Sequence, residues 1–287
     1  MKIYLRCIPC FARQAVEAAE MATDDPALRE KIVREALKVA STTPFDKTPP
    51  HIGMEIHRII RRIVGNTDPY KELKEKYNKR ALALYPYMKE IVEKSKNRLD
   101  TGVRIAIAGN IIDFGISATE DKIHLNKIIE ETLKSPFAVY NFNQFEKDIK
   151  AADNILYIAD NAGEIVFDRV LIEEIPDYRK KVTLVVRGHP VINDATMEDA
   201  EQCGLTKLVR VINNGSDAPG TILETCSEEF RHELKIADLI IAKGQGNYET
   251  LSEIDKNIYF LLKAKCNVLA NDLNVNVGDI ILKKNYN

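Results

Sequence analysis

The stretch Asn154-Ile-Leu-Tyr-Ile-Ala-Asp-Asn-Ala-Gly-Glu-Ile-Val-Phe-Asp168 decides the fold. It opens with an apolar run typical of a buried strand, and the polar pair Asp160 and Asn161 follows directly. A small Ala-Gly turn then leads through Glu164 into an amphipathic run that predicts a helix over 164–175. In open parallel sheets ligands bind beyond the carboxyl ends of the strands, so this succession places polar side chains where a ligand would lie.

Asp160 and Asn161 supply a carboxylate and an amide carbonyl, hard oxygen donors that suit Mg²⁺, Mn²⁺ or a similar ion. The same pair after a strand also serves as a turn and a helix N-cap, and taken alone it favours that simpler interpretation. The choice between a metal site and a simple turn with a helix N-cap depends on the residues in the rest of the chain.

The size and charge of the chain limit the classes of protein to which it can belong. Its 287 residues can bury a large core in one or two domains. A net charge of −2 excludes a general basic field for nucleic-acid binding. No apolar run is long enough to span a bilayer, and the first six residues lack the apolar core of a signal peptide. We therefore expect a cytoplasmic protein without nucleic-acid or membrane partners.

Five cysteines, an odd number spread over a long chain, argue against a secreted disulfide framework. Cys7-Ile-Pro-Cys10 is a C-x-x-C motif, but no second such pair completes a four-thiolate zinc site. We interpret Cys7 and Cys10 as half-buried thiols at the start of a helix that are dispensable for the chemical step. A structural metal site completed by a distant thiol such as Cys266 is the alternative.

Residues 1–100 predict a helical N-terminal domain. Helices are expected over 11–21, 26–40, 52–64 and 68–96, with Gly65 as the C-cap of the third. The histidines and arginines of this region, His51, His57, Arg61 and Arg62, are most simply part of solvated helix faces.

Residues 101–287 show the alternation of an α/β domain. Strands are predicted over 103–108, 154–159, 182–187, 208–212, 239–242, 258–262 and 267–270. Helices are predicted over 164–175, 195–203, 223–237 and 247–254, and 283–287 reads as a frayed tail. Such alternation predicts a parallel sheet with helices on both faces.

Polar groups follow five of these predicted strands. They are Asn110 with Asp113, Asp160 with Asn161, His189 with Asn193 and Asp194, the run 213–217, and Lys243 with Asn247. Each group alone is an ordinary polar loop. The carboxyl ends of parallel strands meet at one rim, so the five together favour a site there.

The residue types at this rim fit phosphate chemistry. Two carboxylates and an amide oxygen can hold a divalent ion and leave positions open for water and substrate. Lys243, beside two glycines, could meet a phosphate as a point charge, with backbone N–H groups helping. His189 could be an acid, a base or only a loop residue. Neither a P-loop motif nor a G-x-G-x-x-G fingerprint is present, which argues against the common nucleotide-binding enzymes.

Six short pieces of the sequence carry a likeness to a known family. They are Cys7-Ile-Pro-Cys10, Asp68-Pro-Tyr70, Gly109-Asn-Ile-Ile-Asp113, Asp160-Asn-Ala-Gly-Glu164, Asn193-Asp194 and Lys243-Gly-Gln-Gly-Asn247. Together they resemble the DUF89 family of metal-dependent damage-control phosphatases, related to the protein once called acidic residue methyltransferase 1. The likeness spans nearly the whole chain, and the C-x-x-C motif resembles the stand-alone microbial branch.

This resemblance implies a helical N-terminal region packed on a Rossmann-like three-layer αβα sandwich with a largely parallel sheet. It also implies a divalent metal ion (Mn, Co, Ni or Mg) held by Asp160, Asn161 and Asp194, with Asn110, Asp113 and Lys243 lining the phosphate pocket. Family members hydrolyse phosphate monoesters, often sugar phosphates or damaged phosphometabolites.

We therefore expect a metal-dependent phosphatase. The expected phosphate contacts are Asn110, Lys243, Gly244 and Asn247. Asp113 or Glu164 would position the water or protonate the leaving oxygen, and Asp160 would be the nucleophile if an aspartyl-phosphate forms. The alternatives are a methyltransferase that uses S-adenosylmethionine and a non-catalytic module that binds a metal or a phosphometabolite.

Overall fold

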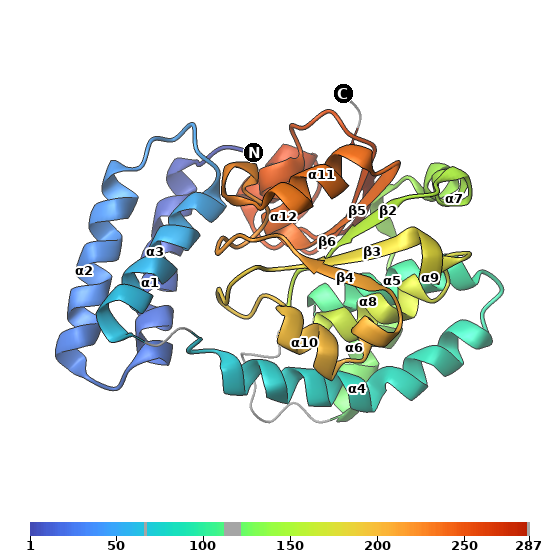
Figure 1. Cartoon of the computed structure of the whole chain (residues 1–287), viewed down its shortest axis with the longest axis horizontal. Helices are drawn as coiled ribbons and strands as arrows, with labels where there is room; N and C mark the ends of the chain where they lie inside the picture. Colours follow the sequence, from blue (N-terminus) through green and yellow to red (C-terminus); the bar gives the residue numbers. More distant parts are fainter. Residues whose placement is uncertain (66–67, 112–121, 286–287) are drawn as a thin grey trace.

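A computed structural model describes residues 1–65, 68–111 and 122–285, and it contains a helical unit beside a sheet unit (Figure 1). The helical unit consists of the short turn η1 (Leu5–Cys7) and the helices α1 (Ile8–Ala22), α2 (Pro26–Thr42) and α3 (Pro49–Val64). Its inward faces share an apolar cluster that includes Phe11, Ile32 and Ile56. Gly65, in the left-handed conformation with φ 76°, ends α3 as predicted.

The described residues of the sheet unit form one seven-stranded sheet in the order β1-β7-β6-β5-β2-β3-β4. Its strands are β1 (Phe137–Tyr140), β2 (Ile155–Ile158), β3 (Val182–Val186), β4 (Arg210–Asn213), β5 (Leu239–Lys243), β6 (Ile258–Lys263) and β7 (Ile280–Lys284). All neighbouring strands are parallel except β6 and β7. The predicted α/β sandwich with a largely parallel sheet is therefore confirmed.

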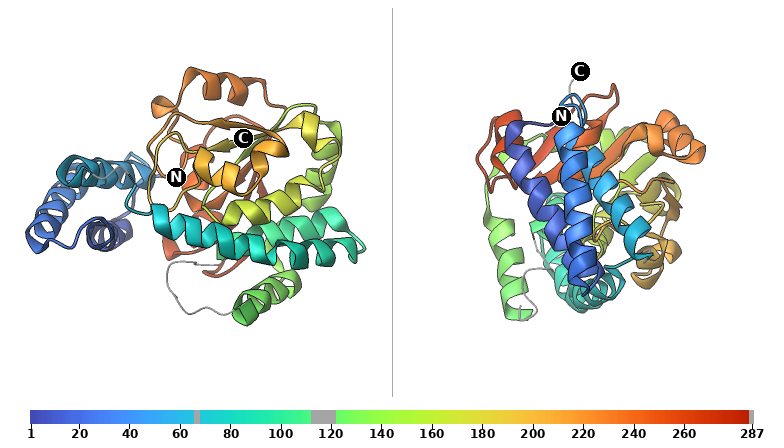
Figure 2. Two further views of the ribbon diagram at one scale, coloured as in Figure 1. Left: turned by 60° about the horizontal axis from the view of Figure 1, so that its bottom comes forward. Right: turned by 90° about the vertical axis from the view of Figure 1, so that its left-hand side faces the viewer.

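Helices cover both faces of this sheet, which makes three layers (Figures 1 and 2). The helices on one side of the sheet are α4 (Lys71–Glu93), α5 (Arg98–Ile111), α6 (Lys122–Lys134), α7 (Phe142–Ala151), α8 (Glu164–Ile172), α9 (Tyr178–Lys181) and α10 (Met197–Gln202). The other face packs on α11 (Glu228–Ile236), α12 (Gly244–Leu251) and α13 (Asn267–Leu273), and the turns η2 (Leu205–Lys207) and η3 (Leu223–Thr225) connect elements. Alternate residues of β2 pack against opposite helix layers. Ile155 and Tyr157 belong to the apolar cluster on the α8 side, and Leu156 and Ile158 belong to the cluster on the α12 side.

The long helix α4 packs with the sheet unit rather than with α1–α3. Its buried residues Tyr77, Leu84 and Met88 join the apolar cluster on one face of the sheet, and Figure 2 shows α4 running along that unit. The apolar cluster of the helical unit includes no residue of α4. A domain boundary at residue 100 stays a prediction, and these contacts favour one near residue 65.

None of the helices described in these ranges is long and apolar enough to cross a bilayer.

Two predicted strands are helices. The run 103–108 lies inside α5, which is buried on almost every side, so it lacks the polar face that distinguishes a surface helix from a strand. At Gly109, a Cβ would lie 2.8 Å from Cβ of Phe167, which shows how closely α5 approaches α8. The run 267–270 begins α13, whose first turn is capped by the sulfur of Cys266, which accepts a hydrogen bond from the N–H of Leu269 at 3.4 Å.

The edge of the sheet differs from expectation as well. β1 was not predicted, and it pairs in parallel with β7. β7 contains Lys283 and Lys284, which the sequence placed in a frayed tail. Both strands are short, and β1 alternates half-buried with exposed residues, so they lack the continuous apolar run of a central strand.

Candidate active site

The turn after β2 is held against the loop after β3 by backbone hydrogen bonds. Asn161 and Asp194 form an isolated antiparallel bridge. On either side of it, the N–H of Ala195 donates to the carbonyl of Asp160 at 2.9 Å, and the N–H of Ala162 donates to that of Asn193 at 2.8 Å. The three predicted metal ligands thus lie on two segments that are joined directly.

The carboxylates of Asp160 and Glu164 share two amide donors. The side-chain N–H₂ of Asn161 donates to Asp160 Oδ2 at 2.9 Å and to Glu164 Oε2 at 3.0 Å. Asn110 donates to the same two oxygens at 3.2 Å each. Asn110 lies in the last turn of helix α5 rather than after a strand, and its side chain contacts Asp160 at this rim.

Two buried cations accompany four carboxylates at this rim. Arg187 donates to Asp194 at 2.6 Å and lies 3.9 Å from Asp160. Lys243 lies 2.7 Å from Glu164 and 2.5 Å from Asp168. When all four carboxylates are ionised, they exceed the two buried cations by two negative charges, which equals the charge of one divalent ion.

Burial and this excess charge shift the pKa values of the group. Burial, then the neighbouring Glu164 and Asp194, raise the pKa of Asp160 well above its ordinary value. Burial would also raise the pKa of Glu164, but Lys243, Lys265 and the amide of Asn161 together lower it below its ordinary value, which favours the ionised carboxylate. Burial raises the pKa of Asp168 to about 6 despite its contact with Lys243. Arg187 offsets the charge of Asp160 only in part, from 3.9 Å.

The donor set fits a hard divalent cation. Asp160, Asn161 and Asp194 offer carboxylate and amide oxygens on adjoining segments, and the charge excess matches the ion. No group of three His, Cys, Asp or Glu side chains is arranged for a metal among the residues with described positions. Asn161 presents its N–H₂ to Asp160, and a half-turn of the amide would present the oxygen instead.

Gly244 allows the loop after β5 to approach Asp160. Its φ is 77°, and a Cβ built on it would lie 1.9 Å from Asp160 Oδ2. A side chain here would collide with the carboxylate. The sequence placed Gly244 beside a phosphate, whereas the structure places it against the predicted metal ligand.

Lys243, which the sequence analysis expected to contact a phosphate, faces the interior. Its side chain turns into the protein, is fully buried, and donates to the carbonyl of Ala106 at 2.9 Å as well as to its two carboxylates. An ammonium has three N–H bonds, so none remains for a phosphate in this arrangement. Lys243 is therefore placed to orient Glu164.

Asn247 also faces inward. It is fully buried, and its amide donates to the carbonyls of Ala159 and Lys243 at 3.1 and 2.7 Å. Its Oδ1 accepts from Thr221 at 2.8 Å and from Arg187 at 3.3 Å. These bonds tie β5 to the end of β2 and leave the side chain no free group for a substrate.

Two other predicted residues, His189 and Asp217, fall outside the cluster, whereas Asp113 lies outside the described residues. His189 is exposed. Asp217 pairs with Arg58 at 2.8 Å and with Arg61, so it joins α3 to the loop after β4.

The sequence interpretation missed two cations, Arg187 and Lys265. Arg187 directly follows β3, whereas the sequence interpretation made it the last residue of that strand. Lys265 is exposed, has no ion-pair or hydrogen-bond partner within the described ranges, and acts electrostatically on both Asp160 and Glu164. The signal for Lys265 was its place two residues beyond the carboxyl end of β6, which is parallel to β5 and ends at the same rim.

Comparison with known proteins identifies the family. Residues 3–281 match the model of the damage-control phosphatase ARMT1-like domain. The chain belongs to this family. It is 38% identical to damage-control phosphatases of Pyrococcus horikoshii and Archaeoglobus fulgidus, over 99% of this chain and of each relative. The crystal structure of a DUF89 family protein from P. horikoshii superimposes with a TM-score of 0.92 at 37% identity over the full length of both chains.

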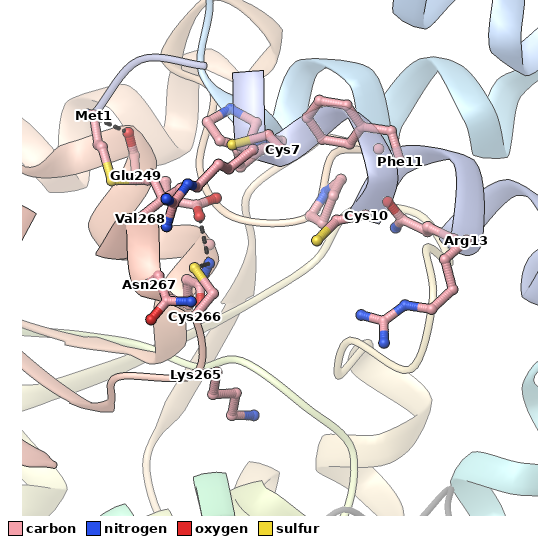
Figure 3. Close-up of a pocket in the computed structure, with 18 of the residues that line it drawn as sticks. Met1, Cys7, Cys10, Phe11, Arg13, Glu249, Lys265, Cys266, Asn267 and Val268 are labelled. Carbon is pink, nitrogen blue, oxygen red and sulfur yellow. Dashed lines mark hydrogen bonds between the residues drawn. The ribbon is translucent and has the colours of Figure 1, made fainter. Parts of the chain in front are cut away.

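In this damage-control phosphatase family member, a cavity of about 690 Å³ lies between the helical unit and the sheet unit. We call it the interface cavity. Cys7, Cys10 and Cys266 all line it (Figure 3), but no three Cys, His, Asp or Glu side chains among the described residues are grouped to hold a metal ion. Burial raises the pKa of the Cys7 thiol, which disfavours the thiolate that a metal needs.

Proposed function

We propose that this chain is a divalent-metal-dependent phosphatase of small phosphate monoesters. The family supports phosphatase chemistry, because relatives that match it over their full length are named damage-control phosphatases. The observation that carries the metal dependence is the buried excess of two negative charges around Asp160. A bound divalent ion would polarise a phosphoryl oxygen and lower the pKa of a water molecule.

The residues that would hold the ion are Asp160, Asn161 and Asp194. The guanidinium of Arg187 holds the carboxylate of Asp194 by a hydrogen bond of 2.6 Å. Gly244 has no Cβ that would collide with the carboxylate of Asp160. Mn²⁺, Co²⁺, Ni²⁺ and Mg²⁺ all accept such oxygen donors.

Glu164 would act as a hydrogen-bond acceptor for the attacking water. Lys243 keeps Glu164 ionised, so it is suited to accept a proton rather than to donate one to the leaving oxygen. Asn110 braces the same carboxylate and Asp160. Lys265 takes the phosphate role expected of Lys243, because its ammonium is exposed and unpartnered within the described ranges beside these two acids.

The test is a screen of purified protein against phosphate esters with several divalent ions, in which free phosphate and methyl transfer from S-adenosylmethionine are measured together. We expect phosphate release that depends on the added ion, and no methyl transfer. Methyl transfer without phosphate release would favour the methyltransferase alternative. Ion binding with neither reaction would favour a binding module.

A further inference from the structure

The interface cavity adjoins the candidate active site through the first turn of α12. Gly244 faces Asp160, and the next two residues, Gln245 and Gly246, line the cavity. On the other side, Ile192 lines the cavity two residues before Asp194. Lys265 lines it as well, so the cation assigned to the phosphate stands at its edge. A molecule bound at Asp160 would therefore extend into this cavity.

Ile192 marks the junction with an unusual backbone. Its φ is 46°, in the left-handed region that a β-branched side chain rarely adopts. The same loop is anchored to the helical unit, because Arg61 donates to the carbonyl of Pro190 at 3.1 Å. Such strain persists only where surrounding contacts impose it, and it concentrates at ligand sites.

The far wall of the cavity is cationic. Arg6 and Arg13 line it from η1 and α1, and both are exposed. Arg6 has no ion-pair partner in the described part of the chain, and Arg13 has only the exposed Glu17 at 3.8 Å, a weak surface pair. Figure 3 shows Arg13 and Lys265 extending from different walls.

One acid opposes these cations. Glu249 lines the cavity, is buried, and accepts a hydrogen bond from Gln245 at 2.6 Å. Burial raises the pKa of Glu249 to about 7, so at and below neutral pH this acid offsets the cations only in part. The balance of charge in the cavity therefore favours an anion. Its volume of about 690 Å³ suits a small molecule.

We propose that the interface cavity receives the leaving group of the substrate, and that this leaving group carries a second anionic group bound by Arg13 and Arg6. The substrate class is thus a phosphate monoester with a distal phosphate or carboxylate. This inference deepens the proposed phosphatase function and rests on it for the position of the first phosphate.

The test measures binding without turnover. Alkane-α,ω-bisphosphonates of increasing spacer length, ω-phosphonocarboxylates and alkylphosphonates of equal length cannot be hydrolysed. Their affinities for the full chain with Mg²⁺ are measured by calorimetry. We expect the best compound with two anionic groups to bind at least about tenfold more tightly than the matching alkylphosphonate, as for one added charged contact. The bisphosphonate and phosphonocarboxylate arms show which distal anion is preferred.

The double variant Arg6→Gln, Arg13→Gln tests the position of the second anion. It should reduce the preference for two anionic groups to within about twofold, while the control Lys31→Gln, Lys38→Gln keeps it. The control lysines have the same spacing of seven residues and are exposed on α2, outside the cavity. Thermal unfolding checks that both variants fold, and single variants replace the double variant if it does not.

Equal affinity of wild type for compounds with one and two anionic groups would overturn the proposal, as would a preference that survives in the double variant. Failure of the proposed function gives a different result. In that case the preference for two anionic groups and its loss in the double variant persist, but no phosphate ester that carries the preferred distal anion is hydrolysed.

Discussion

The contact between Gly244 and Asp160 allows the most direct test at the scale of single residues. In Gly244→Ala the new Cβ would collide with Asp160 Oδ2, 1.9 Å away, so we expect the carboxylate to move. Displacement of a catalytic group by about 1 Å commonly costs roughly 10²-fold in rate. The measurement is kcat/KM for phosphate release.

Gly65→Ala is the matched control for this change. Gly65 has a φ of 76°, almost that of Gly244, but a Cβ there would meet nothing within 4 Å. Both variants should lose about 1–2 kcal/mol of unfolding free energy from the left-handed backbone. Equal activity of the two variants would show that the carboxylate contact is unimportant.

Replacement of Lys265 should mainly reduce activity, whereas replacement of Lys243 should mainly reduce stability. Lys265→Ala removes an exposed charge, so kcat/KM should fall about 10²–10³-fold while unfolding free energy changes by less than about 0.5 kcal/mol. Lys243→Met leaves the buried Glu164 and Asp168 without a cation and should cost about 3–5 kcal/mol of stability.

The measurements are kcat/KM for phosphate release and the free energy of unfolding by chemical denaturation, for both variants. If Lys265→Ala turns over normally, the phosphate is bound elsewhere. If Lys243→Met is as stable as wild type, the buried ion pairs do not hold this site together.

His57 should make the fold sensitive to acid. Burial, then the neighbouring Arg61, lower its pKa to about 4, and Asp217 opposes this only in part. An unfolded chain binds the proton near pH 6.5, whereas the folded chain binds it only near pH 4. The destabilisation is therefore absent above pH 6.5, grows as the pH falls to 4, and is constant below.

Replacement of His57 by Phe should remove about 3 kcal/mol of this loss between pH 7 and pH 4. Urea unfolding at several pH values measures it, with His232→Asn as the control, since His232 is exposed. Parallel pH curves for wild type and His57→Phe would refute the assignment.

At the scale of secondary-structure elements, α4 supports the turn between β2 and α8. Asn78 of α4 accepts a hydrogen bond from the N–H of Gly163 at 2.7 Å and donates to Asp199 at 2.8 Å. In Asn78→Ala we expect kcat to fall about tenfold because the turn that carries Asp160 loosens. We also expect a loss of about 1–3 kcal/mol of stability.

Gln202→Ala separates the two effects of Asn78. It removes another partner of the Asn78 amide, at 2.7 Å, but leaves the bond to Gly163 intact. Its kcat should stay near wild type. An Asn78→Ala enzyme with normal kcat and reduced stability would mean that Asn78 has only a structural role.

The elements also show what the sequence can and cannot predict. The turn at Asp160 was predictable because a strand buried on both faces has a continuous apolar run that ends abruptly in polar residues. The run 103–108 was misassigned because α5 is buried on nearly all sides, so its apolar pattern has no helical period. The partners of Lys243 could not be predicted, since Glu164 and Asp168 meet it only through tertiary packing.

At the scale of the whole molecule, the helical unit closes the site from one side. Arg58 and Arg61 of α3 bind Asp217 of the sheet unit, and α1 and α3 form one wall of the interface cavity. Specificity would then come from the helical unit and chemistry from the sheet unit. We propose that phosphate release requires a divalent ion held by Asp160, Asn161 and Asp194.

The requirement for the ion is measured by phosphate release from metal-stripped protein that is titrated with Mn²⁺. We predict that the stripped wild type is inactive, that activity returns and saturates at one ion per chain, and that Asp194→Asn binds the ion at least about tenfold more weakly. Full turnover of the stripped protein in the presence of chelator, or an unchanged ion affinity in Asp194→Asn, would contradict the account.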